Sequence, residues 1–150
     1  WFYVDDFTTF TAGKTVPSRV LVRGDSSFQR VIALYNGGYG YETNTNSDPG
    51  ELAGRTSPLY AAAAITSGQW INFVVSNENS QSTFYINGVF NRTLNVSDNL
   101  QLAYIGRGQD PVNYPDFLKG KVSNFKIYNR ALTAVEVQQN FDALRGRFGI

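Results

Sequence analysis

The carboxylates of the chain are the first candidates for chemistry, because glycoside hydrolysis requires two carboxyl groups that flank the scissile bond. The glutamates of the chain are Glu42, Glu51, Glu78 and Glu136. No two of them stand close together in the sequence, so no strand presents a close glutamate pair. Glu78 falls in an expected turn and Glu136 in an expected helix cap. We therefore expect no catalytic centre.

Three residue types are missing from the sequence, and two of these absences limit which reactions and metal sites are possible. The 150 residues include no histidine, no cysteine and no methionine. Without histidine the chain lacks the commonest general base and metal ligand, and without cysteine it has no thiolate site and no disulfide. A net charge of +1 is not the footprint of a nucleic-acid binder. The longest apolar run, Leu59–Ile65, is too short to cross a membrane. We expect no cofactor, no nucleic-acid partner and no membrane insertion.

Aromatic residues offer a different chemistry, because the apolar face of a sugar ring stacks on an aromatic ring. Four tyrosines stand at expected strand ends or in expected loops, and Arg107 lies between two glycines where it could contact a partner. The candidate ligand-binding residues are Tyr39, Tyr41, Tyr60, Tyr114 and Arg107. The alternative is that the tyrosines border a core and keep only their hydroxyl groups in water.

Short runs rich in aromatic and β-branched residues, separated by turn residues, predict an all-β domain. The expected strands are 1–4, 19–23, 30–35, 39–45, 70–76, 83–86, 89–93, 102–105 and 121–128. Asn87-Gly88 predicts a tight hairpin turn, and Trp70 is expected in the core. The run Leu59–Ile65 fits either a helix or a strand.

One helix is expected near the C-terminus. Thr133 and Glu136 have the spacing of a capping box, and Gly146 is the expected C-cap. Its apolar stripe is Val137, Phe141 and Leu144. In the preceding strand, Lys121–Tyr128, the apolar residues cannot all face one side, which predicts a bulge at Ser123-Asn124.

The length of 150 residues fits one domain. Because the chain opens on strand-like residues, we expect one or two strands to precede Trp1 in the parent polypeptide. The alternation of charged and apolar groups in the tail Arg145–Ile150 fits docking on its own sandwich or on a neighbouring subunit.

The stretches "SGQWINFVVSNENSQSTFYINGVF", "LAYIGRG" and "FLKGKVSNFKIYNRALTAVEVQQNF" resemble the Gly-x-Trp strand, the hairpin and the ending of laminin-G-like domains. The resemblance implies a concanavalin A-like jelly-roll sandwich over residues 1–150, with two antiparallel sheets and one short C-terminal helix. It implies binding rather than catalysis. The ending "FDALRGRFGI" is similar to those of such domains in phage and other virion proteins, which implies an extracellular or virion-surface location.

Departures from this family pattern bear on metal binding. Ser123-Asn124 stand where many relatives have an acidic pair, so the residues there do not support a structural calcium ion. Four loop aspartates could still contribute oxygen ligands: Asp25, Asp48, Asp110 and Asp116.

Two kinds of short motif are interpreted structurally. Arg23-Gly24-Asp25 is the integrin-type tripeptide, and we interpret it as a strand end entering a turn. The glycosylation sequons at Asn91 and Asn95 are interpreted as polar turn residues.

Two functions therefore remain open. The first is a non-catalytic recognition or adhesion module that binds a glycan or a surface protein. The second is a structural capsid-decoration or fibre domain, whose partners are virion proteins or further copies of itself. A glycoside hydrolase is the least supported alternative.

Overall fold

The computed structural model describes residues 1–7, 19–24, 30–35, 38–43, 60–61, 65–95, 102–106 and 118–150. The chain divides into two compact units that alternate along the sequence. The first unit consists of Trp1–Tyr3, Trp70–Asn99 and Val122–Ile150. The second unit consists of Val4–Gln69 and Leu100–Lys121.

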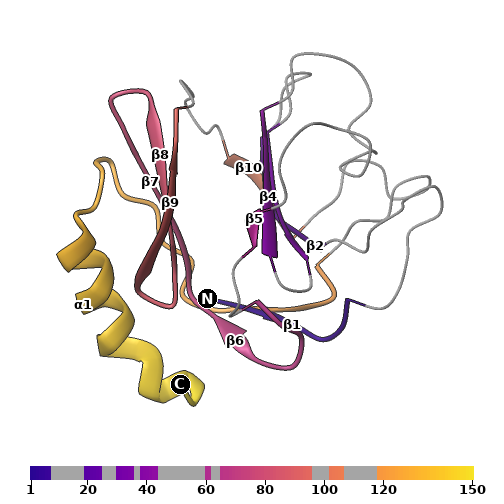
Figure 1. Cartoon of the computed structure of the whole chain (residues 1–150). Helices are drawn as coiled ribbons and strands as arrows, with labels where there is room; N and C mark the ends of the chain where they lie inside the picture. Colours follow the sequence, from indigo (N-terminus) through magenta and orange to yellow (C-terminus); the bar gives the residue numbers. More distant parts are fainter. Residues whose placement is uncertain are drawn as a thin grey trace. The chain divides into compact units, whose positions relative to one another are not determined.

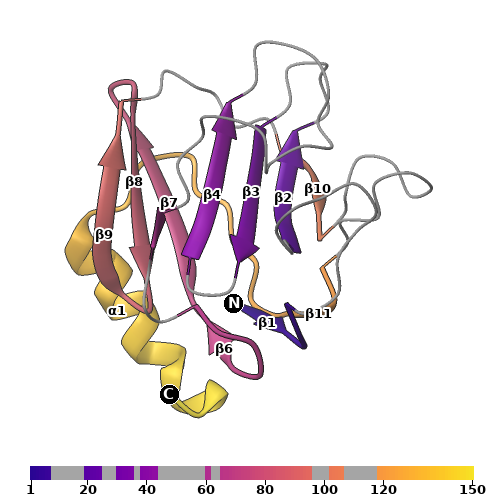
Figure 2. The same ribbon diagram turned by 45° about the vertical axis from the view of Figure 1, so that its right-hand side comes forward.

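Hydrogen bonding groups the strands into three sheets, drawn in Figure 1. The five-stranded sheet has the order β10-β2-β3-β4-β5, and β2, β3 and β4 lie side by side in Figure 2. Its strands are β2 (Arg19–Gly24), β3 (Arg30–Tyr35), β4 (Gly38–Thr43), β5 (Tyr60–Ala61) and β10 (Leu102–Ile105). Every pair in it is antiparallel.

The other described strands form two three-stranded sheets, with the orders β7-β8-β9 and β11-β1-β6. The first contains β7 (Phe73–Glu78), β8 (Gln81–Ile86) and β9 (Val89–Leu94), and the second contains β1 (Phe2–Val4), β6 (Trp70–Ile71) and β11 (Gly120–Val122). In the β7-β8-β9 sheet the central strand β8 is the most buried: Phe84 is fully buried and Ser82 is 1% exposed. Phe84 on one face of β8 and Tyr85 on the other are both buried, so apolar side chains on both of its faces are removed from water.

Two tight turns set the register of β7, β8 and β9. Asn87 and Gly88 have φ angles of 50° and 78°, and Asn79 and Ser80 have 48° and 62°. Positive φ at both central residues matches the twist of a two-residue hairpin. The expected Asn87-Gly88 hairpin is thus confirmed.

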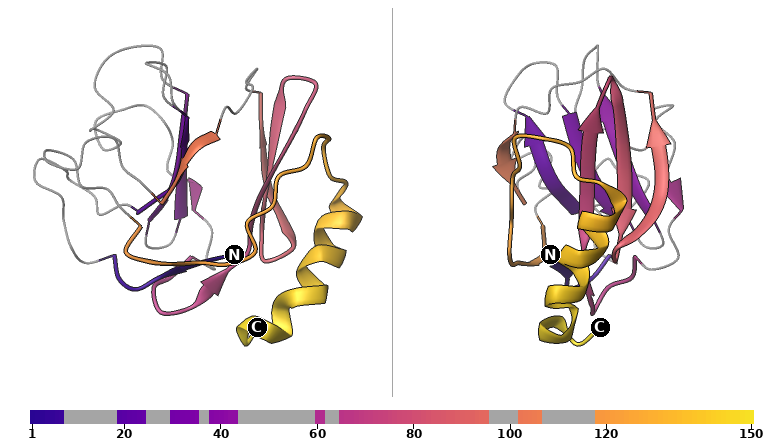
Figure 3. Two further views of the ribbon diagram at one scale, coloured as in Figure 1. Left: turned by 180° about the vertical axis from the view of Figure 1, so that it is seen from behind. Right: turned by 90° about the vertical axis from the view of Figure 1, so that its left-hand side faces the viewer.

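The expected helix is α1 (Ala134–Arg145), which lies along the β7-β8-β9 sheet in Figures 1 and 3. Its capping box is present, and Val137 and Phe141 are buried. Gly146 keeps a right-handed φ of −60°, so the chain continues into a 3₁₀ turn, η1 (Gly146–Phe148). The left-handed glycine that ends the turn is Gly149, with a φ of 75°. In the described part of the chain, no helix has the length and apolar character needed to cross a membrane.

One expected strand is shorter than predicted, and one run whose structure was open is now described in part. The strand expected over Lys121–Tyr128 ends at Val122, because Asn124 takes a left-handed φ of 52° that interrupts regular pairing. The irregularity was thus correctly placed, but the strand beyond it was wrong. In the run Leu59–Ile65, which sequence left open, β5 occupies Tyr60–Ala61 and Ile65 is buried outside any strand.

Candidate functional site

Three of the candidate tyrosines lie on one sheet. Tyr39 and Tyr41 belong to β4 and Tyr60 to β5. Tyr39 is the direct antiparallel partner of Tyr60. Residues directly opposite one another share a face of a sheet, as do residues two apart on one strand. The register therefore gathers these three positions on one face, next to the edge formed by β5.

The neighbours on that face are apolar. Across the β3–β4 pair, Tyr39 stands opposite Leu34 and Tyr41 opposite Ile32. This arrangement fits an aromatic platform with an apolar inner border, and it equally fits tyrosines that border a core. The opposite face of the same strands carries Val31, Tyr35 and Glu42 together with small residues at Ala33, Gly38, Gly40 and Ala61.

The other two candidates, Tyr114 and Arg107, lie outside the described residues. The same holds for the loop aspartates Asp25, Asp48, Asp110 and Asp116. Within the described ranges, no group of three or more histidine, cysteine, aspartate or glutamate side chains is arranged to hold a metal ion.

The integrin-type tripeptide begins inside a sheet. Arg23 pairs with Val31 of β3 and with Tyr104 of β10, so its backbone has a strand on either side. Gly24 is the last residue of β2. The described part of the motif is therefore a strand end, which agrees with the structural interpretation of the sequence.

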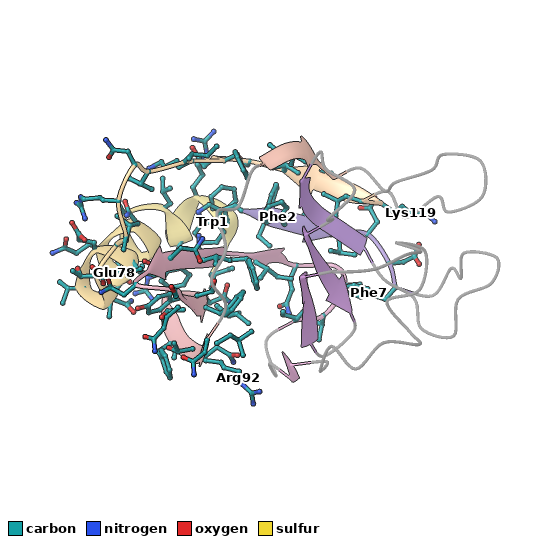
Figure 4. All side chains as sticks on the ribbon, turned by 90° about the horizontal axis from the view of Figure 1, so that it is seen from above. Trp1, Phe2, Phe7, Glu78, Arg92 and Lys119 are labelled. Atoms are coloured by element: carbon teal, nitrogen blue, oxygen red, sulfur yellow. The ribbon has the colours of Figure 1, made fainter. Side chains whose placement is uncertain are left out.

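The glutamates stand on separate elements. Glu42 lies on β4 opposite Val31. Glu78 ends β7, is exposed and is labelled in Figure 4. Glu136 belongs to the cap of α1, and Glu51 lies outside the described residues. The three described glutamates thus lie on three different elements.

Electrostatics around α1 explain the role of Glu136. Arg130 donates two hydrogen bonds to its carboxylate, and the backbone N–H of Thr133 donates a third. These hydrogen bonds, those from Arg130 first, lower the pKa of Glu136 from its ordinary 4.5 to about 2. The carboxylate is therefore charged at neutral pH and occupied in fixing the start of the helix.

The sequence did not reveal an aromatic cluster in the first unit. The indole of Trp1 is stacked with both Phe141 and Phe148, whose ring centroids are 5.6 and 4.2 Å away. Phe148 also lies 4.8 Å from Trp70, whose ring meets Tyr3 edge-on at 5.5 Å. Figure 4 shows the Trp1 side chain beside α1. The tail therefore docks on its own unit, which answers the question that the sequence left open.

This cluster changes the expected role of Trp70. Trp70 is only half-buried, whereas Ile71 next to it is fully buried and Trp1 is 4% exposed. The indole that the core encloses is therefore Trp1. The signal in the sequence was the lone aromatic residue, Phe148, in a tail of charged and small residues.

Hydrogen bonds fix the chain around this cluster. The carbonyl of Asn72 accepts from the Asn87 N–H at 2.8 Å, and the Asn72 N–H donates to Asn87 Oδ1 at 2.9 Å. The hydroxyl of Ser76 donates to the carbonyl of Leu132 and accepts from its N–H, each at 2.9 Å. These bonds tie the turn at Asn87 and the segment before α1 to the strands β6 and β7.

Comparison with known proteins assigns the family. A family model described as the concanavalin A-like lectin/glucanases superfamily matches residues 1–138. A search of curated protein sequences found no match. The chain is similar, at 20% identity and a TM-score of 0.46, to a crystal structure of an S-layer domain-containing protein (residues 221–444) from Clostridium thermocellum ATCC 27405. That likeness covers 90% of this chain and 70% of the other. The family match confirms the expected fold class, an all-β concanavalin A-like jelly roll with one short C-terminal helix. The chain belongs to the concanavalin A-like lectin/glucanase superfamily.

Proposed function

We propose that this domain is a non-catalytic recognition module that binds a glycan or a protein at an extracellular surface. Membership of a superfamily that contains lectins supports a binding role. The observation that carries the proposal is the pairing of Tyr39 with Tyr60, which together with Tyr41 groups three aromatic residues on one sheet face. Tyr114 and Arg107, which lie outside the described residues, are proposed to add further contacts to the ligand.

The proposed role is non-catalytic because of which reactive residue types the chain has and where its glutamates lie. The chain has no histidine or cysteine, and Glu136 is held by Arg130 and Thr133. Glu42 and Glu78 belong to different strands. A binding role needs no reactive group, because stacking and hydrogen bonding to sugar hydroxyls suffice.

Binding to a glycan array tests this proposal. The single variants Tyr39→Ala, Tyr41→Ala and Tyr60→Ala are each compared with Val31→Ala, which lies on the opposite face of the sheet. We expect the tyrosine variants to lose binding while their melting curves stay close to that of the parent chain. Val31→Ala should lower the melting temperature and, while still folded, keep its binding.

The outcomes separate the alternatives. Equal loss of stability in the tyrosine variants and in Val31→Ala would mean that the tyrosines border the core, and the proposed site would be rejected. Turnover of a polysaccharide by the purified chain would contradict the non-catalytic role. A mass that rises with concentration, together with no binding to glycans or surface proteins, would instead support the assembly role.

A further inference from the structure

The strand β1 lies between two neighbouring segments, and both of these continue past its Trp1 end. We call the position between them, on the N-terminal side of Trp1, the lane. Its register with β6 pairs Phe2 with Ile71 and Tyr3 with Trp70. On the other side β11 is its neighbour, and the N–H of Ser123 donates to the Trp1 carbonyl at 2.8 Å. Both neighbours thus reach the Trp1 end of β1.

Both flanking segments then run on past Trp1. After Asn72, β6 is followed by β7, which pairs with β8 and is an edge strand among the described strands of its sheet. On the other side the chain continues from Ser123 to Tyr128 without regular structure. In Figure 1 the N-terminal end lies where β6 passes into β7, beside the chain that follows β11.

The two flanks meet again further on. The hydroxyl of Ser76 bonds both backbone groups of Leu132, which closes the lane at its far end. Between the Trp1 end and this contact, β7 contributes Phe73–Val75. The register of β1 with β6 would place the residues preceding Trp1 opposite this stretch.

The backbone of β7 is oriented toward this lane at alternate residues. Asn72 directs its N–H and carbonyl toward Asn87, at the end of β8. Because these directions alternate along an antiparallel pair, Val74 also faces β8 and Val75 faces the other way. The Val75 amide is therefore aimed at the lane.

Apolar side chains beside the lane are incompletely covered. On the irregular flank Phe125 is 36% exposed, Ile127 72% and Tyr128 43%. Val74 and Val75, in the middle of β7, are only half-buried. An inserted strand would cover side chains of this kind and pair with the backbone on both sides.

No strand of the described residues fills this lane, and we infer that it accepts an extended segment that continues β1 on the N-terminal side of Trp1 in the same polypeptide. A segment joined to Trp1 enters in register with β7 and at high effective concentration. Its residues alternate between the face of Phe2 and the face of Trp1, and both faces are buried at β1. An apolar segment without proline is therefore the chemistry that fits.

The test joins valine-threonine-valine directly before Trp1, and a matched variant carries valine-threonine-proline. Trp1 directs its carbonyl to Ser123, so the residue directly before Trp1 directs its N–H toward β7, and proline lacks that N–H. We expect the valine-threonine-valine version to slow hydrogen exchange at the Val75 amide about tenfold, as one added hydrogen bond would do, and to raise the melting temperature. The proline version should exchange like the 150-residue chain, and the Phe84 amide in β8 serves as the internal reference.

Three results would overturn the inference. The first is equal exchange at Val75 in the two extended chains. The second is a Val75 amide that already exchanges as slowly as Phe84 in the 150-residue chain. The third is that free valine-threonine-valine peptide, at stoichiometric concentration, protects the Val75 amide as well as the joined segment does. Covalent continuity with β1 would then not be needed to fill the lane.

Discussion

The indole of Trp1 and the ring of Phe148 are stacked, with centroids 4.2 Å apart and planes 21° apart. Phe148 is reached through the 3₁₀ turn that follows α1, and Trp1 directly precedes β1. The stack therefore joins the end of the helical segment to the sheet that contains β1. Phe141 of α1 also stacks on this indole, at a centroid distance of 5.6 Å, which makes the helix part of this connection.

Replacing Phe148 by alanine should release this connection. Because both tryptophans of the chain contact Phe148, their fluorescence reports on it directly. We expect a red-shifted emission, stronger acrylamide quenching and a loss of about 1–3 kcal/mol in unfolding free energy, below the cost for a fully buried phenylalanine. Arg147→Ala, at the exposed neighbouring position, is the control and should leave the emission unchanged. Unaltered quenching in Phe148→Ala would mean that the tail does not dock there in solution.

The turn between β8 and β9 should tolerate no side chain at Gly88. A Cβ atom there would lie 2.9 Å from Phe141 Cδ1 and 2.9 Å from Gln138 Oε1 of α1. The matched control is Gly68→Ala, since Gly68 has a similar φ of 81° but nothing within 4 Å of an added Cβ. In both variants an alanine must adopt the left-handed backbone conformation, which costs about 1–2 kcal/mol. Gly88→Ala should lose more unfolding free energy than Gly68→Ala, as measured by urea unfolding. Equal losses would show that the turn does not press against the helix.

Local signals in the sequence located most of the elements correctly. Asn87-Gly88 and the Thr133–Glu136 box act within a few residues, so their turn and cap were predicted and are confirmed. Lys121–Tyr128 was extended too far, because strand formation depends on a partner strand that local sequence does not specify. The burial of Trp1 rather than Trp70 depends on Phe141 and Phe148, which are far away in the chain.

The candidate site was predictable only as a set of residue types. The sequence singled out Tyr39, Tyr41 and Tyr60 as aromatic residues near strand ends. That Tyr39 pairs with Tyr60 depends on the register between β4 and β5, which residues 44–59 separate. Register across a connection of this length is set by long-range pairing, so no local motif could have predicted it.

Replacing Ser76 by alanine should loosen the segment that leads into α1. Ser76 is 8% exposed, and its hydroxyl serves both backbone groups of Leu132. Its removal leaves two polar groups without their partner, so we expect a loss of about 1–3 kcal/mol in unfolding free energy. The control is Ser67→Ala at an exposed position, which should change stability by less than about 0.5 kcal/mol. If Ser76→Ala were as neutral as this control, the Ser76 hydroxyl would not hold the segment.

Acid should weaken the start of α1 through Glu136. Its pKa is about 2 in the folded chain, against an ordinary 4.5. A lowered pKa stabilises the folded state fully above pH 4.5, and this stabilisation is lost as the pH falls from 4.5 toward 2. Because the Arg130 pair is exposed to solvent, salt should reduce the effect.

The measurement compares urea unfolding of the parent chain and Glu136→Gln between pH 2 and pH 7. The parent should be the more stable at neutral pH, and the difference should shrink as the pH falls below 4.5, since glutamine carries no titrating charge. Asp142→Asn is the control, because Asp142 forms a looser pair with Arg145 at 3.4 Å and belongs to no cap. A difference between the parent and Glu136→Gln that stayed constant down to pH 2 would contradict the lowered pKa, since a carboxyl group with the same pKa in the folded and the unfolded chain makes no pH-dependent contribution to stability.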